Sequence, residues 1–380
     1  MHVEELNIQN FRSFKEINIK FTPHNLAILM GVNGSGKSSI LDCLAMLFSV
    51  LQNKLADANA RSSDFVLKEN DINFDAEETI NTIKVKTDCY EDILAWTIVK
   101  SQGKEKKSNY KDMNVYVKII EEKLAQNSKL NLPIMVYYQT KKMLLNTSVP
   151  LSGRMTAFGI NHQFNAYENS FSTEIHNFQD FFDWFREEED YENEIQLRKD
   201  RNYINPNLDI VRKAIQTFFG SEFLDCKLSN LQIVRSGMNR NFFRRRSLPP
   251  SLTITKDHRD ITIDYLSDGE QMLLMLVADI ARRLAIANPS LKNALRGKGV
   301  VLIDEIELHL HPQWQKVVIP GLLGTFPNCQ FIVSTHSPQI ATHIKKENIF
   351  LLKDSQIVSA ESLTSAGDSD SFWDEFMGRN

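Results

Sequence analysis

The sequence predicts an α/β fold, and three apolar runs predict it. The run LAILM at residues 26–30 stops at a glycine, and apolar residues then recur at helical spacing from Ile40 to Leu51. The chain therefore goes from strand to loop to helix. Two further apolar runs, at 300–303 and 331–333, each end in acidic, hydroxyl or histidine side chains. Such short runs with polar ends are typical of core strands that present functional groups at one edge of a sheet.

Bulk properties exclude several classes of protein. A chain of 380 residues can form one large domain with an insertion, or two ordinary domains. No apolar segment reaches the roughly 18 residues of a membrane helix, so we expect no membrane partner. The net charge of −4 gives no global attraction for nucleic acid. The four cysteines lie far apart without a CxxC pair, which fits a reducing cytoplasm and predicts neither a zinc site nor disulfides.

The remaining elements follow in chain order from their periodicity. Period-two alternation predicts strands at 3–30 and 79–100, and helical spacing predicts a helix at 111–127. The segment 131–140 is predicted to be a buried strand. These patterns divide the chain into an N-terminal half at 1–144, a mainly helical insertion at 145–225, a C-terminal half at 226–360 and a polar, acidic tail at 361–380.

A glycine-rich stretch follows the first apolar run. Residues 31–38, GVNGSGKS, fit the pattern G-x-x-x-x-G-K-[ST]. Its glycines let backbone N–H groups turn inward around phosphates, Lys37 places a positive charge near the β and γ phosphates, and the Ser38 hydroxyl can bind Mg²⁺. The strand before it and the helix after it favour a phosphate-binding loop over a chance turn. The expected nucleotide-binding residues are Asn33, Gly34, Ser35, Gly36, Lys37, Ser38 and Ser39.

Two acids follow the apolar run at 300–303. Asp304 and Glu305 would lie at the carboxyl edge of the sheet, where nucleotides bind in open α/β folds. We expect Asp304 to hold Mg²⁺ and Glu305 to polarise the attacking water as a general base. A lone Asp-Glu pair would be assigned to a solvated turn, and it is the phosphate-binding loop that gives this pair its catalytic interpretation.

Two further motifs complete the set. The strand QFIVSTHSP ends at His336, which could hydrogen-bond the γ-phosphate and the attacking water, although a lone histidine is more often structural. The motif LSDGE precedes a helical pattern, so Ser267 and Asp268 can cap that helix and leave its N-terminal N–H groups for a phosphate. Taken alone, LSDGE indicates only a helix cap. Its expected nucleotide contacts are Ser267, Gly269 and Glu270.

The order of the phosphate loop, LSDGE, VVLIDE and STHSP resembles the ABC-type ATPase heads of the RecF, SMC and Rad50 group. It is more similar to the compact single-chain ATPases, related to the OLD family, of bacterial anti-phage systems such as Septu. The resemblance covers about half of the chain. It implies a P-loop sheet with an N-terminal antiparallel β subdomain, ATP and Mg²⁺ as cofactors, and composite sites completed by a second copy of the chain.

The resemblance also assigns roles to single residues. Ser267 would reach the γ-phosphate bound by the other copy, although Asp268 departs from the small residue usual in transporters. Gln139 corresponds to the Q-loop glutamine and would approach the metal, whereas a glutamine at a strand end is commonly just solvated. Arg12 of NFRSF is expected near the nucleotide, as in related heads.

The resemblance leaves the partner open between two main hypotheses. The favoured one is an ATP-driven switch that regulates a separate nuclease subunit of HNH type. The alternative is a RecF-like repair ATPase that binds DNA directly, through the arginine-rich segment 235–246. A solvated loop is the simpler interpretation of that segment. A transporter ATPase is a weaker third possibility. The acidic run 187–190 is interpreted as a solvated helix face or a docking surface for a basic partner.

Overall fold

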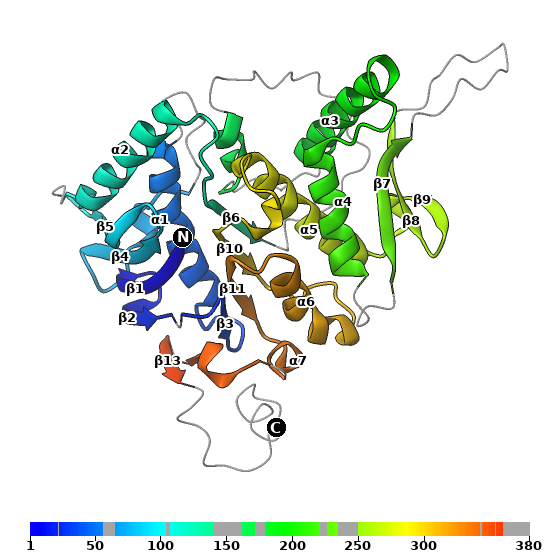
Figure 1. The fold of residues 1–380 in the computed structure, drawn as a ribbon. Helices are drawn as coiled ribbons and strands as arrows, with labels where there is room; N and C mark the ends of the chain where they lie inside the picture. Colours follow the sequence, from blue (N-terminus) through cyan, green and yellow to red (C-terminus); the bar gives the residue numbers. More distant parts are fainter. Residues whose placement is uncertain are drawn as a thin grey trace, which may run out of the picture.

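The computed structural model describes ten stretches of the chain, which form three sheets with helices packed between and around them (Figure 1). The described ranges are 1–21, 23–55, 65–103, 107–139, 162–171, 179–220, 226–234, 250–342, 344–353 and 355–359. The arginine-rich segment 235–246 and the acidic tail 361–380 lie outside them. No helix in the described part of the chain is both long and apolar enough to cross a membrane.

The central sheet has six strands in the order β13-β12-β3-β11-β10-β6. All neighbours are parallel except the pair that β13 forms with β12 at one edge. The strands are β3 (Leu26–Met30), β6 (Ile134–Gln139), β10 (Gly299–Asp304), β11 (Cys329–Thr335), β12 (Ile349–Lys353) and β13 (Gln356–Ser359). Both β3 and β11 are buried at every position, as expected for strands covered on both faces.

The register of this sheet brings four strand ends to one edge. Thr335, the last residue of β11, pairs with Met30 of β3, and Asp304 of β10 pairs with Gln139 of β6. Strands β10 and β11 are themselves paired up to Ile303 and Val333. The polar residues that follow these strands in the sequence therefore meet in space at the carboxyl edge.

A second sheet is antiparallel and has the order β2-β1-β4-β5. Its strands are β1 (His2–Phe11), β2 (Phe14–Lys20), β4 (Glu78–Thr87) and β5 (Tyr90–Ser101). Helix α1 (Lys37–Leu55) contacts both sheets, and the indole of Trp96 on β5 donates to the Leu47 carbonyl of α1 at 3.0 Å (Figure 1). Helix α2 (Lys111–Gln126) packs on β5. The N-terminal antiparallel β subdomain is thus confirmed.

Helices α4 (Pro206–Phe219), α5 (Asp268–Ala287) and α6 (Pro312–Thr325) lie on the side of the central sheet away from α1 (Figure 1). Asp279 of α5 accepts hydrogen bonds from Tyr138 of β6 at 2.7 Å and from Arg282 and Arg283 at 2.9 and 2.7 Å. Burial would raise the pKa of the Asp279 carboxyl, but the two guanidinium groups hold it well below its usual range. This buried network joins α5 to the strand that ends at Gln139.

The predicted insertion contributes α3 (Gln179–Arg198) and α4, and next to them lies a three-stranded sheet. That sheet has the order β7-β8-β9, with β7 (Leu228–Val234), β8 (Ser251–Lys256) and β9 (Arg259–Thr262). A short helix α7 (Pro338–Ala341) and five 3₁₀ helices complete the described part. The 3₁₀ helices are Glu69–Asp71, His162–Tyr167, Ile263–Tyr265, Ala294–Arg296 and Lys346–Asn348.

The interpretation of the acidic run 187–190 on α3 as a solvated face is wrong for Glu188 and Glu189 and holds for the exposed Asp190. Glu189 is 7% exposed and accepts from the Ile233 N–H of β7 at 3.1 Å. Glu188 accepts from Asn205 at 2.6 Å. Glu192, one turn further on, binds the guanidinium of Arg212 through both carboxylate oxygens, at 3.1 and 3.0 Å. Sequence pattern could not reveal these partners, because they come from α4 and β7. The acids hold α3 to its neighbours.

Candidate functional site

The glycine-rich loop between β3 and α1 has a backbone that only glycine adopts readily. Gly34 and Gly36 have φ angles of 82° and 99°. A Cβ atom on Gly36 would also lie 2.2 Å from the ring of Phe14, so a side chain there would clash with the antiparallel sheet. Packing and backbone conformation thus both require glycine at this position. The loop wraps closely enough to present backbone N–H groups to a ligand.

Lys37, the first residue of α1, lies across this loop. It is 6% exposed, and its Nζ donates to the carbonyls of Gly31 at 2.7 Å and Val32 at 2.9 Å. The hydroxyl of Ser35 is buried and has no hydrogen-bond partner among the described residues. A buried ammonium group beside an unsatisfied donor fits an anion with several oxygens, and a phosphate chain is such an anion.

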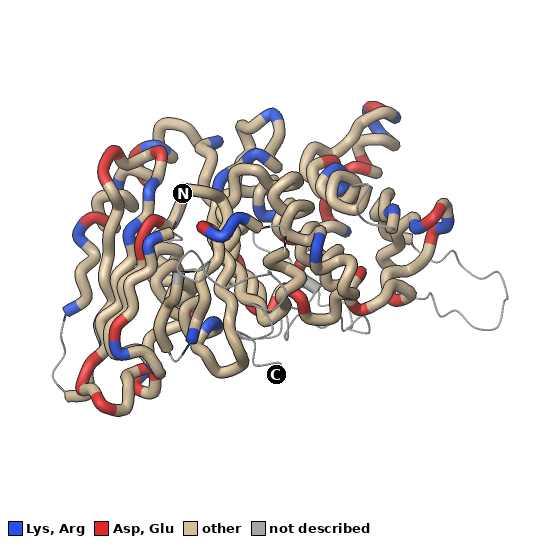
Figure 2. Tube along the Cα trace, turned by 90° about the horizontal axis from the view of Figure 1, so that it is seen from below, with Lys and Arg blue, Asp and Glu red and all other residues tan. Residues whose placement is uncertain are grey.

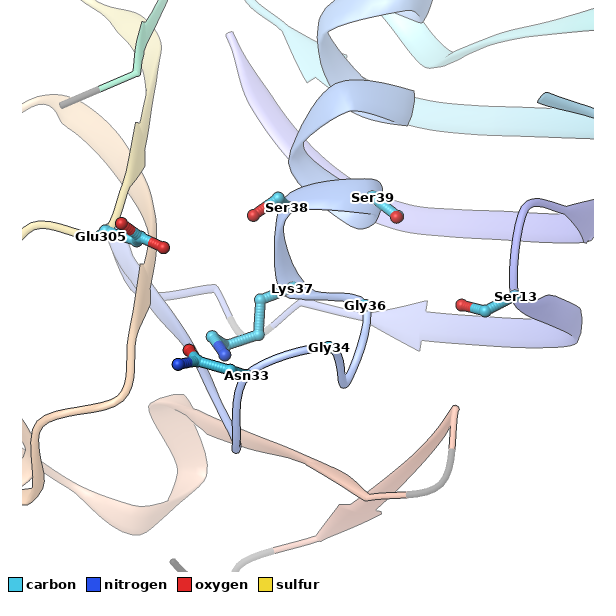
Figure 3. A pocket seen from close by; sticks show the side chains of 8 residues that line it. All are labelled: Ser13, Asn33, Gly34, Gly36, Lys37, Ser38, Ser39 and Glu305. Carbon is cyan, nitrogen blue, oxygen red and sulfur yellow. The ribbon is translucent and has the colours of Figure 1, made fainter. Parts of the chain in front are cut away.

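A hollow opens in front of the loop (Figure 3). In the close-up, Lys37, Ser38 and Asn33 approach it from the loop and Glu305 approaches it from the end of β10. The lining residues are Ser13, Asn33, Gly34, Gly36, Lys37, Ser38, Ser39 and Glu305. Two regions more than 260 positions apart in sequence are therefore combined in one pocket. The predicted loop residues other than Ser35 thus come together here with Glu305, the predicted general base.

Asp304 connects the loop to the neighbouring strands. Its Oδ1 accepts a hydrogen bond from the Ser38 hydroxyl at 3.0 Å, and the hydroxyl of Ser334 on β11 donates to the same atom. Burial raises the pKa of the Asp304 carboxyl above its usual value, against the opposing effect of the two hydroxyls. A cation would reverse that shift. A hydroxyl and a carboxylate are hard oxygen ligands of the type that Mg²⁺ prefers, so Ser38 and Asp304 fit this ion. Gln139 lies beside Asp304 as its partner in the sheet.

Glu305 has a φ angle of 52°, which is uncommon for a residue with a side chain. Its N–H donates to the Ser334 hydroxyl at 2.8 Å, and this bond holds the turn. The Ile306 N–H also reaches the Ser334 carbonyl at 3.2 Å. Left-handed backbone conformations persist where the surroundings fix them, often at functional sites. Here the turn directs the Glu305 side chain into the hollow (Figure 3).

His336 follows β11, and sequence reasoning missed its neighbour. Nδ1 of His336 lies 2.7 Å from Oε1 of Glu307, a carboxylate that is 7% exposed. The His336 backbone N–H donates to the same oxygen at 2.9 Å. The signal in the sequence was a third acid in LIDEIEL, two residues beyond Glu305. A position two residues further along the chain does not by itself place this acid against His336, since a turn begins at Glu305.

The LSDGE motif begins α5 as a capping box. Ser267 is the N-cap, and its N–H donates to Oε2 of Glu270 at 2.9 Å, while Oε1 of Glu270 accepts from Lys256 at 2.6 Å and Cys226 at 3.1 Å. Burial raises the pKa of the Cys226 thiol to about 12. Both carboxylate oxygens of Glu270 are thus engaged within the chain. Gly269 has a close neighbour of its own, since a Cβ there would lie 2.6 Å from the His309 carbonyl.

Ser267 is exposed and is not part of the lining of the hollow. Arg12 also lies outside that lining. It donates to Asp42 of α1 at 2.6 Å and to Asp71 at 2.9 Å, and its guanidinium stacks 5.0 Å from the Phe11 ring centre. Its neighbour Ser13 does line the hollow. His336 lies outside the lining as well. The nucleotide roles of Arg12, Ser267, Gly269 and Glu270, the metal role of Gln139 and the catalytic role of His336 stay predictions, as do the roles expected of the loop, Asp304 and Glu305.

Comparison with known proteins agrees with this architecture. The model of the RecF/RecN/SMC N-terminal domain matches residues 2–359. The chain is similar to the "Retron Vc95 probable ATPase" of Vibrio cholerae serotype O1 biovar El Tor, with 27% identity over 93% of this chain and 74% of that protein. It is similar to the "Retron Ec83 probable ATPase" of Escherichia coli, with 28% identity over 94% and 72%. It is also similar to the Septu protein PtuA of Bacillus mycoides, with 24% identity over 88% of this chain and 38% of that protein.

Proposed function

Because the chain belongs to the RecF/RecN/SMC N-terminal domain family, we propose that it is an ATPase that closes around ATP as a dimer and thereby controls a separate effector. The resemblance to the RecF and SMC group is confirmed by this membership. The observation that carries the proposal is the joining of Lys37 and Ser38 with Glu305 in one hollow, beside the Asp304 carboxylate. The groups proposed to bind phosphate, to hold the metal and to act as the general base thus lie close together, which supports the proposal.

In the proposed reaction, Lys37 exchanges its contacts with the loop carbonyls for the β and γ phosphates of ATP. Ser38 and Asp304 would hold Mg²⁺, which when bound would supply positive charge against those phosphates. Glu305 takes a proton from the attacking water as its oxygen bonds to the γ-phosphorus. The bond from that phosphorus to the bridging oxygen of the β-phosphate breaks, and ADP and phosphate are released. The strained turn at Glu305 and its bond to Ser334 keep that carboxylate in place before ATP arrives, so little rearrangement is needed.

The dimeric part of the proposal rests on Ser267. This residue is exposed at the N-terminus of the 20-residue helix α5 and lies outside the hollow of its own chain. The first N–H groups of such a helix and the positive end of its dipole favour a phosphate. A second copy of the chain could bring this helix end to the γ-phosphate. The same geometry in both directions would give a symmetric dimer with two composite sites.

Mixed dimers test this arrangement. Neither Lys37→Ala nor Ser267→Arg chains should hydrolyse ATP alone. Together they should regain about one working site per mixed dimer, because one interface then pairs an intact loop with an intact Ser267. Turnover is measured by phosphate release as the ratio of the two chains is varied, and it should peak near equal amounts.

The control for this mixture replaces Ser267→Arg with Ser290→Arg, a substitution at a serine beyond the other end of α5. That chain should hydrolyse ATP by itself. The proposed dimer is contradicted if the Lys37→Ala and Ser267→Arg chains form stable mixed dimers, shown by differently tagged copies, and turnover stays at background.

The effector is proposed to be a nuclease subunit of HNH type in an anti-phage system. The similarity to a Septu protein and to two retron ATPases supports this class of role. A head whose dimer depends on ATP can hold a partner inactive in one state and release it in the other. It can do so only if the partner binds the two states with different free energy.

We expect the purified chain alone to leave nucleic acid intact. Plasmid, single-stranded DNA and RNA are incubated with it and Mg²⁺ or Mn²⁺, with and without ATP, and are examined for degradation. Cleavage that follows the protein through purification and survives both Lys37→Ala and Glu305→Gln would show a nuclease site in this chain.

The same preparation is tested for DNA binding, since salt-dependent affinity of the chain alone for DNA would favour the direct, RecF-like role instead. Acidic and basic residues are interspersed over the described elements (Figure 2).

A further inference from the structure

Glu307 lies beneath His336 and contacts it in two ways. Oε1 of Glu307 accepts the His336 backbone N–H at 2.9 Å and lies 2.7 Å from Nδ1 of the ring. The first contact fixes the start of the loop after β11, and the second places a carboxylate against one edge of the imidazole. Glu307 itself is held by the turn that begins at Glu305, since the Leu310 N–H donates to the Glu307 carbonyl at 3.0 Å.

The burial of this carboxylate makes the ring contact energetically important. Oε2 of Glu307 is buried and has no hydrogen-bond partner among the described residues. A buried carboxylate without compensation is costly, so a proton on the facing nitrogen is strongly favoured. Nδ1 of His336 is itself buried and forms no aligned hydrogen bond within the described part of the chain, while Oε1 of Glu307 faces it at 2.7 Å. A small rotation of the ring would let a proton on Nδ1 bind Oε1 of Glu307 and so satisfy this nitrogen, whereas Oε2 takes no part in the contact.

The other edge of the ring is exposed. The His336 side chain is 42% exposed although Nδ1 is buried, so the exposed part is the edge that carries Nε2. Thr335, the preceding residue, pairs with Met30 directly before the phosphate-binding loop. Ser334, one residue earlier, holds the turn of Glu305. His336 therefore follows a strand end that borders both the loop and the Glu305 turn, although its side chain is not part of the lining of the hollow.

We propose that Glu307 is a positioning residue that keeps the proton of neutral His336 on Nδ1, so that Nε2 acts as a hydrogen-bond acceptor for the attacking water. This inference rests on the proposed ATPase function. The tautomer decides which partner His336 can have: a protonated Nε2 would donate to a γ-phosphate oxygen, whereas an unprotonated Nε2 accepts from water. Glu305, as the base, accepts one hydrogen of the water, and His336 accepts the other. A lone pair of the water oxygen then faces the phosphorus.

Histidine NMR tests the tautomer without any turnover. Long-range ¹H–¹⁵N spectra of protein labelled in its nine histidines distinguish the two neutral forms and the cation. The His336→Gln spectrum identifies the signals of His336 by their loss. At about pH 8.5, above the usual titration range of histidine, we expect the Nδ1-protonated form in the wild type. Glu307→Ala should shift it toward the Nε2-protonated form that predominates for a free side chain in water.

A matched control uses the other close pair of glutamate and histidine. Glu347 lies 2.8 Å from Nε2 of His24, and both side chains are exposed, so Glu347→Gln should leave the His336 signals unchanged. If Glu307→Ala does not fold, Glu307→Gln keeps the size and an acceptor while removing the charge. The proposal is overturned if wild-type His336 is found as the cation or as the Nε2-protonated form, or if both Glu307 variants leave its tautomer unchanged.

Kinetics provide the second test. Glu307→Gln should lower kcat for ATP about 10- to 100-fold, as is typical when a group that orients a functional histidine is lost, and should leave KM nearly unchanged. In a His336→Gln background the same substitution should add less than about twofold, because a positioning residue acts only through its partner. Equal effects in both backgrounds would overturn the proposal. If the wild-type chain has no ATPase activity, the proposed function is overturned instead. The histidine NMR spectra would then still show whether Glu307 sets the tautomer of His336.

Discussion

Lys37→Ala should lower the affinity for ATP with Mg²⁺ by at least about 100-fold, because a charge-assisted hydrogen bond to phosphate contributes roughly 1.5–3 kcal/mol and Lys37 is proposed to bind two phosphates. The ammonium group is already buried against the loop, bound to the carbonyls of Gly31 and Val32. Those carbonyls cannot replace it as phosphate ligands. Isothermal titration with ATP and Mg²⁺ measures the loss, and hydrolysis should disappear with it.

Lys54→Ala is the matched control for this variant. Lys54 lies in the last turn of the same helix and donates to Asn114 at its exposed surface, so its loss should leave ATP affinity unchanged. Thermal unfolding distinguishes a binding defect from a folding defect, because removal of Lys37 also deprives two loop carbonyls of a donor. A Lys37→Ala chain that folds and binds ATP with wild-type affinity would contradict the assignment of the phosphate-binding loop.

The strands and helices that carry the candidate site could be predicted because their signals are local. The run LAILM is buried on both faces and therefore reads as continuous apolar sequence, and β3 occupies those five residues. The helix predicted at 111–127 is found as Lys111–Gln126. Glycine at the two loop positions with positive φ is likewise visible in sequence, since few other residues adopt that conformation. These expectations are confirmed.

Pairings between distant residues could not be predicted in the same way. Glu270 was expected at the nucleotide, and its carboxylate is bound by Lys256 and Cys226, which approach from β8 and from the start of the segment leading into β7. The order of the central sheet, with β12 beside β3, likewise depends on contacts more than 300 residues apart. Sequence periodicity predicts which face of a helix or strand is buried, but it does not identify the element that packs against this face.

Glu305→Gln should bind ATP as the wild type does and hydrolyse it about 10² to 10⁴ times more slowly, as expected when a general base is neutralised. Glutamine has nearly the same size as glutamate, and the backbone bond from residue 305 to the Ser334 hydroxyl does not involve the side chain. The turn with its positive φ should therefore persist. Single-turnover measurements with radiolabelled ATP separate the slowed chemical step from binding and product release.

The Glu305→Gln variant should also accumulate as an ATP-bound dimer. In the proposed cycle the two chains need ATP to close into a dimer and need hydrolysis to separate again. Size-exclusion chromatography with ATP and Mg²⁺ should then show more dimer for Glu305→Gln than for the wild type, and Lys37→Ala should remove that excess. Glu194→Gln, at a glutamate on α3 that pairs with the exposed Arg198, is the control and should behave as the wild type in both measurements. Wild-type turnover by Glu305→Gln would exclude Glu305 as the base, and Glu307, the next carboxylate on the same turn, would then have to be considered for that role.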